Sequence, residues 1–385
     1  MRDGWVETTF GDVFKIVAGK YVAKEEYVEG GEFWIYGSNS IMGKLDRFLV
    51  QQSHVIMAAI GAYAGAVRYS KEPSWINNNA MALVPSEKVM AKYLYLWLES
   101  MFDLKRVVVG TGQPYVQRPL LLKEIIELPP LLEQKRIVDL ISSVDSYVEA
   151  LQQQLESAKR SRNAVLHELL TAGGDDWVET TLGEAAEVIM GRQLSPSKKL
   201  GTRPRPYIRA ANIGSWGINL EDIYEMDFTE IEEERFACQV GDTILVEGGN
   251  EKSVGCPSLI TEKESGLCIQ NTVIRSRSRN SKALDPNFQY HLLRFMFWRG
   301  DFAQLCAGTT IMHLGQKRAE VVPISIPPLG EQLNIVDTIS KFDSAVTYSE
   351  ETLISAKSLR SGLLSELLSG EHLIPSSYDK VIGAA

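Results

Sequence analysis

The chain has 385 residues, of which 44% are hydrophobic, and a formal net charge of -9 at neutral pH. This length and composition predict two to three domains, each with a hydrophobic core. The negative charge argues against a surface that binds nucleic acid all over, although it is compatible with a locally basic face.

The cysteines and the N-terminus indicate a cytoplasmic protein. All four cysteines lie in the second half without CxxC spacing, which favours packed thiols in a reducing compartment over a metal site or a disulfide framework. The first ten residues lack the apolar core of a signal peptide. The longest apolar run, Val55–Val67, is too short to span a membrane.

The first region follows a leader, WVETTFG at residues 5–11, and mixes short β-like runs with turn signals. These runs predict strands at Glu32–Tyr36, His54–Ala59, Ala66–Tyr69 and Ala80–Val84. Apolar residues on one face predict a helix at about Lys88–Arg106. The region is therefore expected to be a mixed α/β domain, rich in sheet.

A long helix is predicted at Leu131–Ala172. Its apolar residues follow one another in steps of four and three over several heptads, which is typical of a coiled coil. A double proline precedes the helix and a double glycine follows it, as is common at helix ends.

The second half repeats this plan. The leader returns as Trp177–Gly183, 172 residues later, and the helix returns as Leu329–Gly370, 198 residues later, with 20 of 42 positions identical. Between them, strands are predicted at Pro206–Arg209, Thr243–Val246, Leu259–Thr261 and Thr272–Arg275, and a helix after Pro286. Such a long period indicates duplicated domains rather than a solenoid.

Two matching seams in one chain most simply pack on each other. A tandem duplicate with a twofold axis across the helix pair requires antiparallel helices. The predicted fold is therefore α+β and pseudo-twofold symmetric, with an intramolecular antiparallel coiled coil. Its domains are residues 1–128, 129–172 (helix), 173–326 and 327–385 (helix and tail).

Arg162 and Arg360 occupy the same seam position in the two helices. A buried arginine is costly unless its charge reaches water or meets an acid. The pair could fix the register of the helices, or it could face a partner protein.

No catalytic motif is present. The sequence has no GxGxxG in a βαβ context, no HExxH, no GxSxG and no Asn/Asp-Pro-Pro-aromatic signature of amino-methyltransferases. The five histidines show no ligand spacing. We therefore expect a chain without catalytic activity, without a metal site and without a cofactor of its own.

Basic residues gather locally in the second region. Residues 192–209 contain six lysines and arginines and no acid. They could lie on a solvated strand edge, or they could contact phosphate while nearby polar groups read base edges. The candidates for DNA contact in this region are Lys198, Lys199, Arg203, Arg205, Tyr207, Arg209, Asn212, Thr309, Thr310, His313, Gln316 and Lys317.

A second basic group, Arg275, Arg277, Arg279 and Lys282, is open to the same two interpretations. In the first region, polar loop residues are analogous candidates, although each of them taken singly is more typical of a turn former than of a base reader. They are Ser38, Asn39, Ser40, Tyr63, Thr111, Gln113, Tyr115, Gln117 and Arg118.

Taken together, the chain resembles a specificity subunit of a type I restriction–modification system. The resemblance covers essentially the whole length and rests on the two leaders and on helices that begin PPLLEQKRIV and PPLGEQLNIV. The segments WIYGSNS (Trp34–Ser40) and PYIRAANI (Pro206–Ile213) are also similar to target-recognition segments of that family.

The resemblance implies that each variable region is a target-recognition domain for one half of a bipartite DNA site, and that the coiled coil sets the gap between the halves. It also implies two methyltransferase subunits as partners, which hold S-adenosylmethionine, and ATP- and Mg-dependent restriction subunits that can join them. The alternatives are a coiled-coil adaptor between proteins, without DNA recognition, and an enzyme with unfamiliar motifs.

Overall fold

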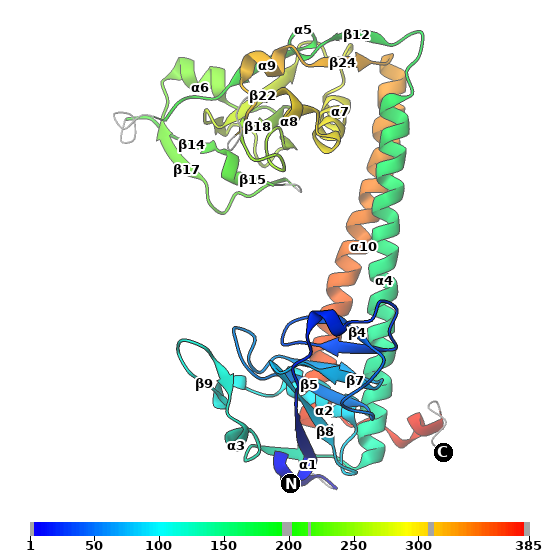
Figure 1. The fold of residues 1–385 in the computed structure, drawn as a ribbon. Coiled ribbons are helices and arrows are strands. Elements are labelled where there is room, and N and C mark those ends of the chain that lie inside the picture. Colours follow the sequence, from blue (N-terminus) through cyan, green and yellow to red (C-terminus); the bar gives the residue numbers. More distant parts are fainter. Residues whose placement is uncertain (1–3, 195–201, 215–216, 307–311, 381–385) are drawn as a thin grey trace. The chain divides into compact units, whose positions relative to one another are not determined.

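The computed structural model describes residues 4–194, 202–214, 217–306 and 312–380 (Figure 1). The chain divides into two compact units, Met1–Gln153 with Glu350–Ala385, and Gln154–Ser349. Each unit therefore holds one variable region together with a part of both long helices. Among the described residues, no helix is both long and apolar enough to cross a membrane.

The variable region of unit 1 is built on two small sheets. A four-stranded antiparallel sheet has the order β2-β8-β5-β6, and a three-stranded sheet has the order β4-β3-β7, in which β3 and β7 are parallel. The strands are β1 (Val6–Thr9), β2 (Phe14–Ala18), β3 (Phe33–Tyr36), β4 (Ile41–Leu45), β5 (His54–Ala58), β6 (Val67–Ser70), β7 (Ser74–Ile76), β8 (Ala80–Pro85), β9 (Val108–Val109), β10 (Tyr115–Val116) and β11 (Ile125–Leu128). The helices are α1 (Phe10–Val13), α2 (Ala91–Ser100) and α3 (Arg118–Leu121), with short 3-10 turns η1 (Lys24–Glu26) and η2 (Leu104–Arg106).

Unit 2 repeats this topology with longer connections. Its sheets have the orders β13-β22-β18-β20 and β17-β14-β21, and β14 and β21 are parallel. The strands are β12 (Val178–Thr181), β13 (Ala186–Met190), β14 (Pro204–Ile208), β15 (Ile213–Gly214), β16 (Gly217–Ile218), β17 (Tyr224–Asp227), β18 (Thr243–Val246), β19 (Gly248–Gly249), β20 (Pro257–Leu259), β21 (Cys268–Ile269), β22 (Val273–Ser278), β23 (Met312–His313) and β24 (Pro323–Ile326). The helices are α5 (Leu182–Ala185), α6 (Glu230–Phe236), α7 (Pro286–Arg299), α8 (Asp301–Leu305) and α9 (Gln316–Glu320), with the 3-10 turn η4 (Ala210–Asn212).

The two leaders form equivalent strands. β1 pairs with β11 just before the first long helix, and β12 pairs with β24 just before the second. This explains why WVETT stands at the front of each half: it closes each domain against the strand that leads into the long helix.

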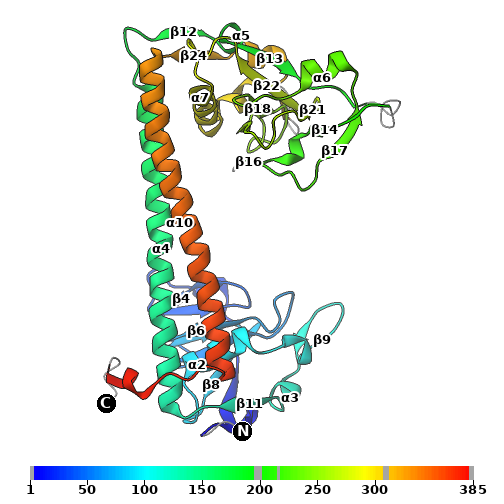
Figure 2. The same cartoon turned by 180° about the vertical axis from the view of Figure 1, so that it is seen from behind.

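The long helices are α4 (Leu131–Thr171) and α10 (Leu329–Ser369), within a residue of the predicted ends. In unit 1, the seam residues Ile137 and Ile141 of α4 share a core with Leu364 and Leu368 of α10. In unit 2, Leu166 and Leu170 of α4 share a core with Ile335 and Ile339 of α10. Residue numbers rise on one helix as they fall on the other, so the helix segments in each unit are antiparallel (Figure 2).

A buried glutamine in the first turn of each long helix fastens the helix to its domain. The Gln134 side chain is 0% exposed; its oxygen accepts from the Met90 amide at 2.9 Å, and its nitrogen donates to two backbone carbonyls at 3.0 Å. Gln332 makes the same three bonds in unit 2, with the Asp285 amide as donor. Because each amide has all three of these groups paired, it can be buried without an unsatisfied atom.

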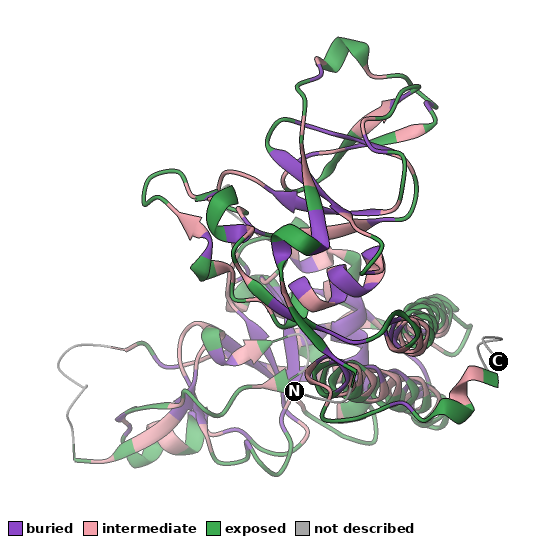
Figure 3. Ribbon diagram, turned by 90° about the horizontal axis from the view of Figure 1, so that it is seen from below, coloured by how far each residue is buried: buried purple, intermediate pink, exposed green. Residues whose placement is uncertain are grey.

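Buried residues are concentrated in the strands, whereas much of the outer surface of the long helices is exposed (Figure 3). β5 and β8 are buried along nearly their whole length because they lie in the middle of their sheet. The core of unit 1 continues from these strands through α2 into the helix seam. Burial of this seam explains how two helices of mixed composition are held together.

Most predicted strands are confirmed, but the helix predicted at Lys88–Arg106 is too long. α2 ends at Ser100, and a separate 3-10 turn follows, capped by the Asp103 carboxylate that accepts from the Lys105 amide at 3.0 Å. The strand predicted at Leu259–Thr261 lies two residues earlier, at Pro257–Leu259.

The tail after α10 docks on unit 1. Ile374 is buried, Tyr378 packs against the same core, and the Asp379 carboxylate accepts two hydrogen bonds from Arg136 at 2.6 Å. Its last described turn is η5 (Ser376–Lys380). The described part of the tail is therefore docked on unit 1.

Candidate nucleic-acid interface

Five connections gather at one edge of the unit 1 sheets. The ends of β2, β3, β5 and β7 lead into this edge, and the Asn77–Asn79 turn forms its centre. The carbonyl of Asn79 accepts from the Ala59 amide at 2.9 Å, and Gly61 donates to the carbonyl of Pro114 at 2.8 Å. Loops far apart in the sequence thus form one surface, which we call the loop edge: residues 19–23, 37–40, 59–66, 77–79 and 110–115.

A close backbone approach holds this edge in place. A Cβ atom on Gly19 would lie 1.9 Å from the carbonyl oxygen of Asn77, so only glycine fits there. In unit 2, a Cβ atom on Gly191 would lie 2.3 Å from the carbonyl oxygen of Gln270. In both domains, a glycine therefore allows the segment after β2 or β13 to lie against the turn that follows β7 or β21.

The structure brings most first-region candidates to the loop edge. Ser38–Ser40 form the turn between β3 and β4, and Tyr63 lies in the connection from β5 to β6. Thr111 and Gln113 are exposed in the loop between β9 and β10, and Tyr115 bridges to Ile60. Gln117 and Arg118 lie further on, at the start of α3, where their carbonyls accept from helix amides and the Gln117 amide donates to the Val107 carbonyl at 2.8 Å.

The basic stretch of unit 2 is neutralised by acids from elsewhere in the fold. Arg203 donates to Glu230 and to Glu233 on α6, both at 2.6 Å, and Arg205 donates to Glu233 at 2.6 Å. Hydrogen bonds from Arg205 and Arg203 lower the pKa of Glu233. The sequence stretch has no acid of its own, but the folded surface does. DNA phosphates would therefore have to compete with α6 for these two arginines.

Arg209 lies beside the same surface. It forms an ion pair with Asp222, and its guanidinium lies 4.1 Å above the Tyr224 ring. Stacking of this kind orients a guanidinium and leaves its edge available for further hydrogen bonds. Arg209 therefore stays a candidate for DNA contact.

Three candidates are removed by their surroundings. Tyr207 is 3% exposed and packs in the core of unit 2, and Asn212 is 2% exposed, with its amide bonded to Arg209, Asn219 and Asp222 backbone groups. Gln316 accepts from the Met190 amide at 3.1 Å and donates to Glu320 at 2.8 Å. Because these polar groups are engaged inside the domain, we do not propose that they contact DNA.

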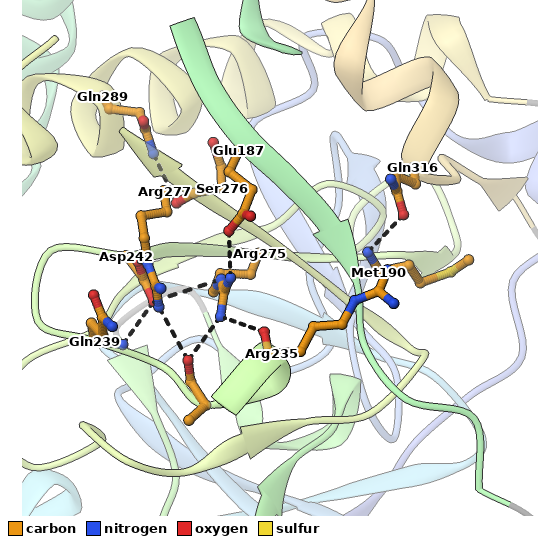
Figure 4. A network of polar contacts seen from close by, with 11 residues as sticks. Glu187, Met190, Arg235, Gln239, Asp242, Arg275, Ser276, Arg277, Gln289 and Gln316 are labelled. Atoms are coloured by element: carbon orange, nitrogen blue, oxygen red, sulfur yellow. Dashed lines mark hydrogen bonds and ion pairs between the residues drawn. The ribbon is translucent and has the colours of Figure 1, made fainter. Parts of the chain in front are cut away.

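The second basic group is largely structural. The Arg275 side chain is 2% exposed and bonds to Glu187 at 2.7 Å and to the carbonyls of Arg235 and Ala237, while Arg277 makes a two-point pair with Asp242 at 2.7 Å (Figure 4). Neither interpretation of the sequence foresaw a buried network. The network fixes α6 and the turn that follows it against β22.

The remaining candidates lie on β23 and α9 or outside the described residues. His313 is exposed and lies 3.1 Å from the Glu247 carboxylate, and Lys317 is exposed on α9. Lys198, Lys199, Thr309 and Thr310 lie outside the described residues. No group of three histidine, cysteine, aspartate or glutamate side chains that could hold a metal ion occurs in the described part of the chain.

Several side chains at the loop edge of unit 1 were not candidates. Lys20, Tyr21 and Lys24 are exposed after β2, and Asn78 is exposed in the central turn. These residues are scattered singly through the sequence, so no local cluster marks them. The run Asn77–Asn79 was visible as a turn signal, but a turn alone does not identify a contact surface.

Comparisons with known proteins agree with this architecture. A family described as the type I restriction modification DNA specificity domain matches residues 2–160 and 174–356. The chain is 21% identical to the type I restriction enzyme MjaVIII specificity subunit of Methanocaldococcus jannaschii, over 96% of this chain and 93% of the relative.

Solved structures share the fold. The S subunit of a type I restriction–modification system from M. genitalium superposes with a TM-score of 0.60 at 17% identity, over 94% of this chain and 96% of that one. The HsdS subunit from Thermoanaerobacter tengcongensis does so with a TM-score of 0.50 at 18% identity, over 97% and 98%. Because the family match extends over both halves, the chain belongs to the type I restriction–modification DNA specificity family.

Proposed function

We propose that the chain is the non-catalytic specificity subunit of a type I restriction–modification complex and recognises an asymmetric DNA site in two parts. Each variable region reads one part, and the paired long helices set the gap between them. The observation that carries this proposal is that two domains of one topology present different loops on the same frame.

The difference is largest in the connections around the three-stranded sheets. In unit 1, β3 is joined to β4 by a turn of residues 37–40. In unit 2, the corresponding connection runs from residue 209 to 223 and contains the β15-β16 pair. Unit 2 also has α6 between β17 and β18, where unit 1 has no helix between β4 and β5. Unlike loops on like frames support two unlike half-sites.

We further propose that two copies of one methyltransferase subunit dock on surfaces that the duplication has kept alike. Exposed side chains are not held by core packing, so their identity in both copies suggests a shared partner. Exposed residues identical in the two halves are Val6 and Val178, Glu7 and Glu179, Ser146 and Ser344, Ser157 and Ser355, and Glu168 and Glu366.

Near the first pair, unit 1 has a hollow of about 340 Å³ lined mainly by apolar groups, including Val6, Leu128, Pro130 and Leu131. Val6 is 62% exposed and Leu131 is 48% exposed, and both line this one hollow, so they form a continuous apolar surface. An apolar segment of the partner subunit fits such a surface. S-adenosylmethionine, and ATP with Mg, would then belong to the partner subunits rather than to this chain.

Selection from random-sequence duplexes tests the proposal. The chain with its methyltransferase partner should enrich a motif of two unlike parts with a fixed gap. Enrichment of one contiguous motif, or of none, would overturn it. An adaptor without DNA recognition would still bind the partner but enrich nothing.

Charge reversal distinguishes this proposal from the alternative of an adaptor without DNA recognition. Reversal at Arg203, Arg205 and Arg209 should abolish the salt-dependent part of DNA affinity contributed by the second domain. Binding of the methyltransferase partner should be unchanged, because these arginines lie in the variable region and not on the repeated surface.

A further inference from the structure

An open hollow of about 600 Å³ lies at the loop edge of unit 1. Its lining comes from three separate stretches of the sequence and contains no carboxylate. The lining residues are Tyr21, Val22, Lys24, Tyr27, Ser40, Ile41, Met42, Asn77, Asn78 and Asn79.

Three lysines lie in or beside this hollow. Lys24 lines it, Lys20 precedes the lining residue Tyr21, and Lys44 is two residues from the lining residue Met42 on β4. None of the three forms an ion pair with a residue in the described ranges, whereas the nearby Arg47 is paired with Glu26. Unit 2 differs, because its arginines on the corresponding side are held by α6. The lysine charge of the first domain is therefore free for an anion.

The hollow is rigidly framed. The Lys20 amide donates to the carbonyl of Ile76 at 2.8 Å, and the Trp75 indole donates to the carbonyl of Lys20 at 3.0 Å. The Tyr27 ring packs over Gly43, where any Cβ atom would lie 2.6 Å from the ring. Because the backbone is fixed by these contacts, it does not have to be ordered when a ligand binds, which reduces the entropy lost on binding.

Exposed aromatic rings accompany the lysines. Tyr21 is 73% exposed, and Trp34 is 42% exposed with the Lys44 ammonium 4.3 Å from its ring centre. Lysines interleaved with aromatic and amide side chains are typical of surfaces that bind nucleic acid, in which cations meet phosphate and amides meet base edges.

We propose that the first domain binds the DNA backbone at this hollow. Lys20 and Lys24 bind phosphates, and the exposed Asn78 amide reads an adjacent base edge of the first half-site. The inference rests on the proposed function and adds the phosphate contacts of the first domain, which the sequence did not reveal.

Binding of a duplex that carries the recognised site tests this, with the chain in complex with its methyltransferase partner. The variants Lys20→Gln and Lys24→Gln should each weaken binding roughly three- to tenfold at moderate salt and lower the salt dependence by about one counterion. The matched control is Lys71→Gln, an exposed lysine between β6 and β7, at the opposite end of the sheet. It should bind as the wild type does.

The variant Asn78→Ala separates base recognition from phosphate binding. It should relax the base preference at one position of the first half-site, by about five- to a hundredfold in discrimination, and leave the second half-site unchanged. Wild-type affinity and salt dependence in a Lys20→Gln, Lys24→Gln double variant would overturn the assignment of the hollow while leaving the two-part site intact. Absence of a two-part site in the wild-type complex would instead overturn the proposed function.

Discussion

The Arg360 guanidinium of α10 donates to the Asp145 carboxylate of α4. The internal repeat contains an equivalent contact in which α4 supplies the arginine and α10 supplies the acid. In the second contact, Arg162 of α4 lies 3.3 Å from Asp343 of α10. Both partners are displaced by 198 residues, so the two pairs are equivalent under the internal repeat. Each seam arginine thus meets an acid inside its own unit, which accounts for its position without a partner protein.

Removal of Asp343 should be the more damaging of two matched changes. Asp343 also receives two bonds from Arg294, at 2.6 and 2.8 Å, and the side chains of Arg162 and Arg294 are only 6% and 11% exposed. Asp343→Ala removes the acid that Arg162 and Arg294 share and should lower the free energy of unfolding by about 3–5 kcal/mol.

Asp145→Ala is the control for this prediction. The Arg360 side chain is 25% exposed and can turn toward water, so the loss should be only about 1–2 kcal/mol. Urea denaturation of the two variants measures the difference. Equal losses would contradict the idea that Arg162 and Arg294 of unit 2 depend on one shared carboxylate, that of Asp343.

Stability should fall with acidification because of His291. Burial lowers the pKa of this imidazole from 6.5 to about 4, and the Arg294 charge acts in the same direction. The unfolded chain takes up the proton near pH 6.5, whereas the folded chain does so only near pH 4. The contribution of neutral His291 to the free energy of unfolding is therefore fully present above pH 6.5, and it is lost as the pH falls from 6.5 towards 4.

Between pH 7.5 and 5, His291 should account for a loss of about 2 kcal/mol. The measurement is the urea midpoint at both pH values for the wild type and for His291→Gln, which cannot titrate. The slope with pH should be flatter in the variant. An unchanged slope would show that the imidazole takes up its proton at the same pH in the folded and the unfolded chain.

Two arginines of the second domain should behave differently although both belong to basic stretches of sequence. Arg275→Met removes a 2% exposed group from the network in Figure 4 and takes the donor from Glu187 and from the Arg235 carbonyl, whereas the Ala237 carbonyl keeps a bond from Arg277. It should lower stability by about 2–4 kcal/mol and leave the recognised sequence unchanged.

Arg205→Gln should do the reverse. Its side chain is 37% exposed, so its pair with Glu233 adds little to stability, and the free energy of unfolding should change by less than about 1 kcal/mol. DNA affinity should fall severalfold and depend less on salt. A DNA affinity equal to that of the wild type would contradict this prediction and would place Arg205 outside the interface.

The duplicated parts of the fold could be predicted because the chain contains its own comparison. Residues that recur at one offset, such as Asp145 and Asp343 or Gln134 and Gln332, marked the frame of both halves. Their roles could not be predicted, because the partners Arg360 and the Met90 amide come from distant elements.

The candidate site was predicted less completely because charge clusters in sequence are not charge clusters in space. Arg203 and Arg205 stand in a stretch without acids, yet α6 supplies Glu230 and Glu233 across the surface. Conversely, Lys20 and Lys24 meet Asn78 only after β2 and β7 have ended at the same edge. A periodic pattern reports which face is buried, but it does not report which loops meet.

The central claim, that the helix pair sets the gap between two half-sites, is tested most directly by lengthening both helices. Seven residues inserted after Gln153 and seven after Glu351 preserve the heptad seam and add about 10.5 Å. At about 3.4 Å per base pair, that is roughly three base pairs. Selection from random duplexes should return both half-sites unchanged with a gap about three base pairs longer. An unchanged gap, or altered half-sites, would contradict the account.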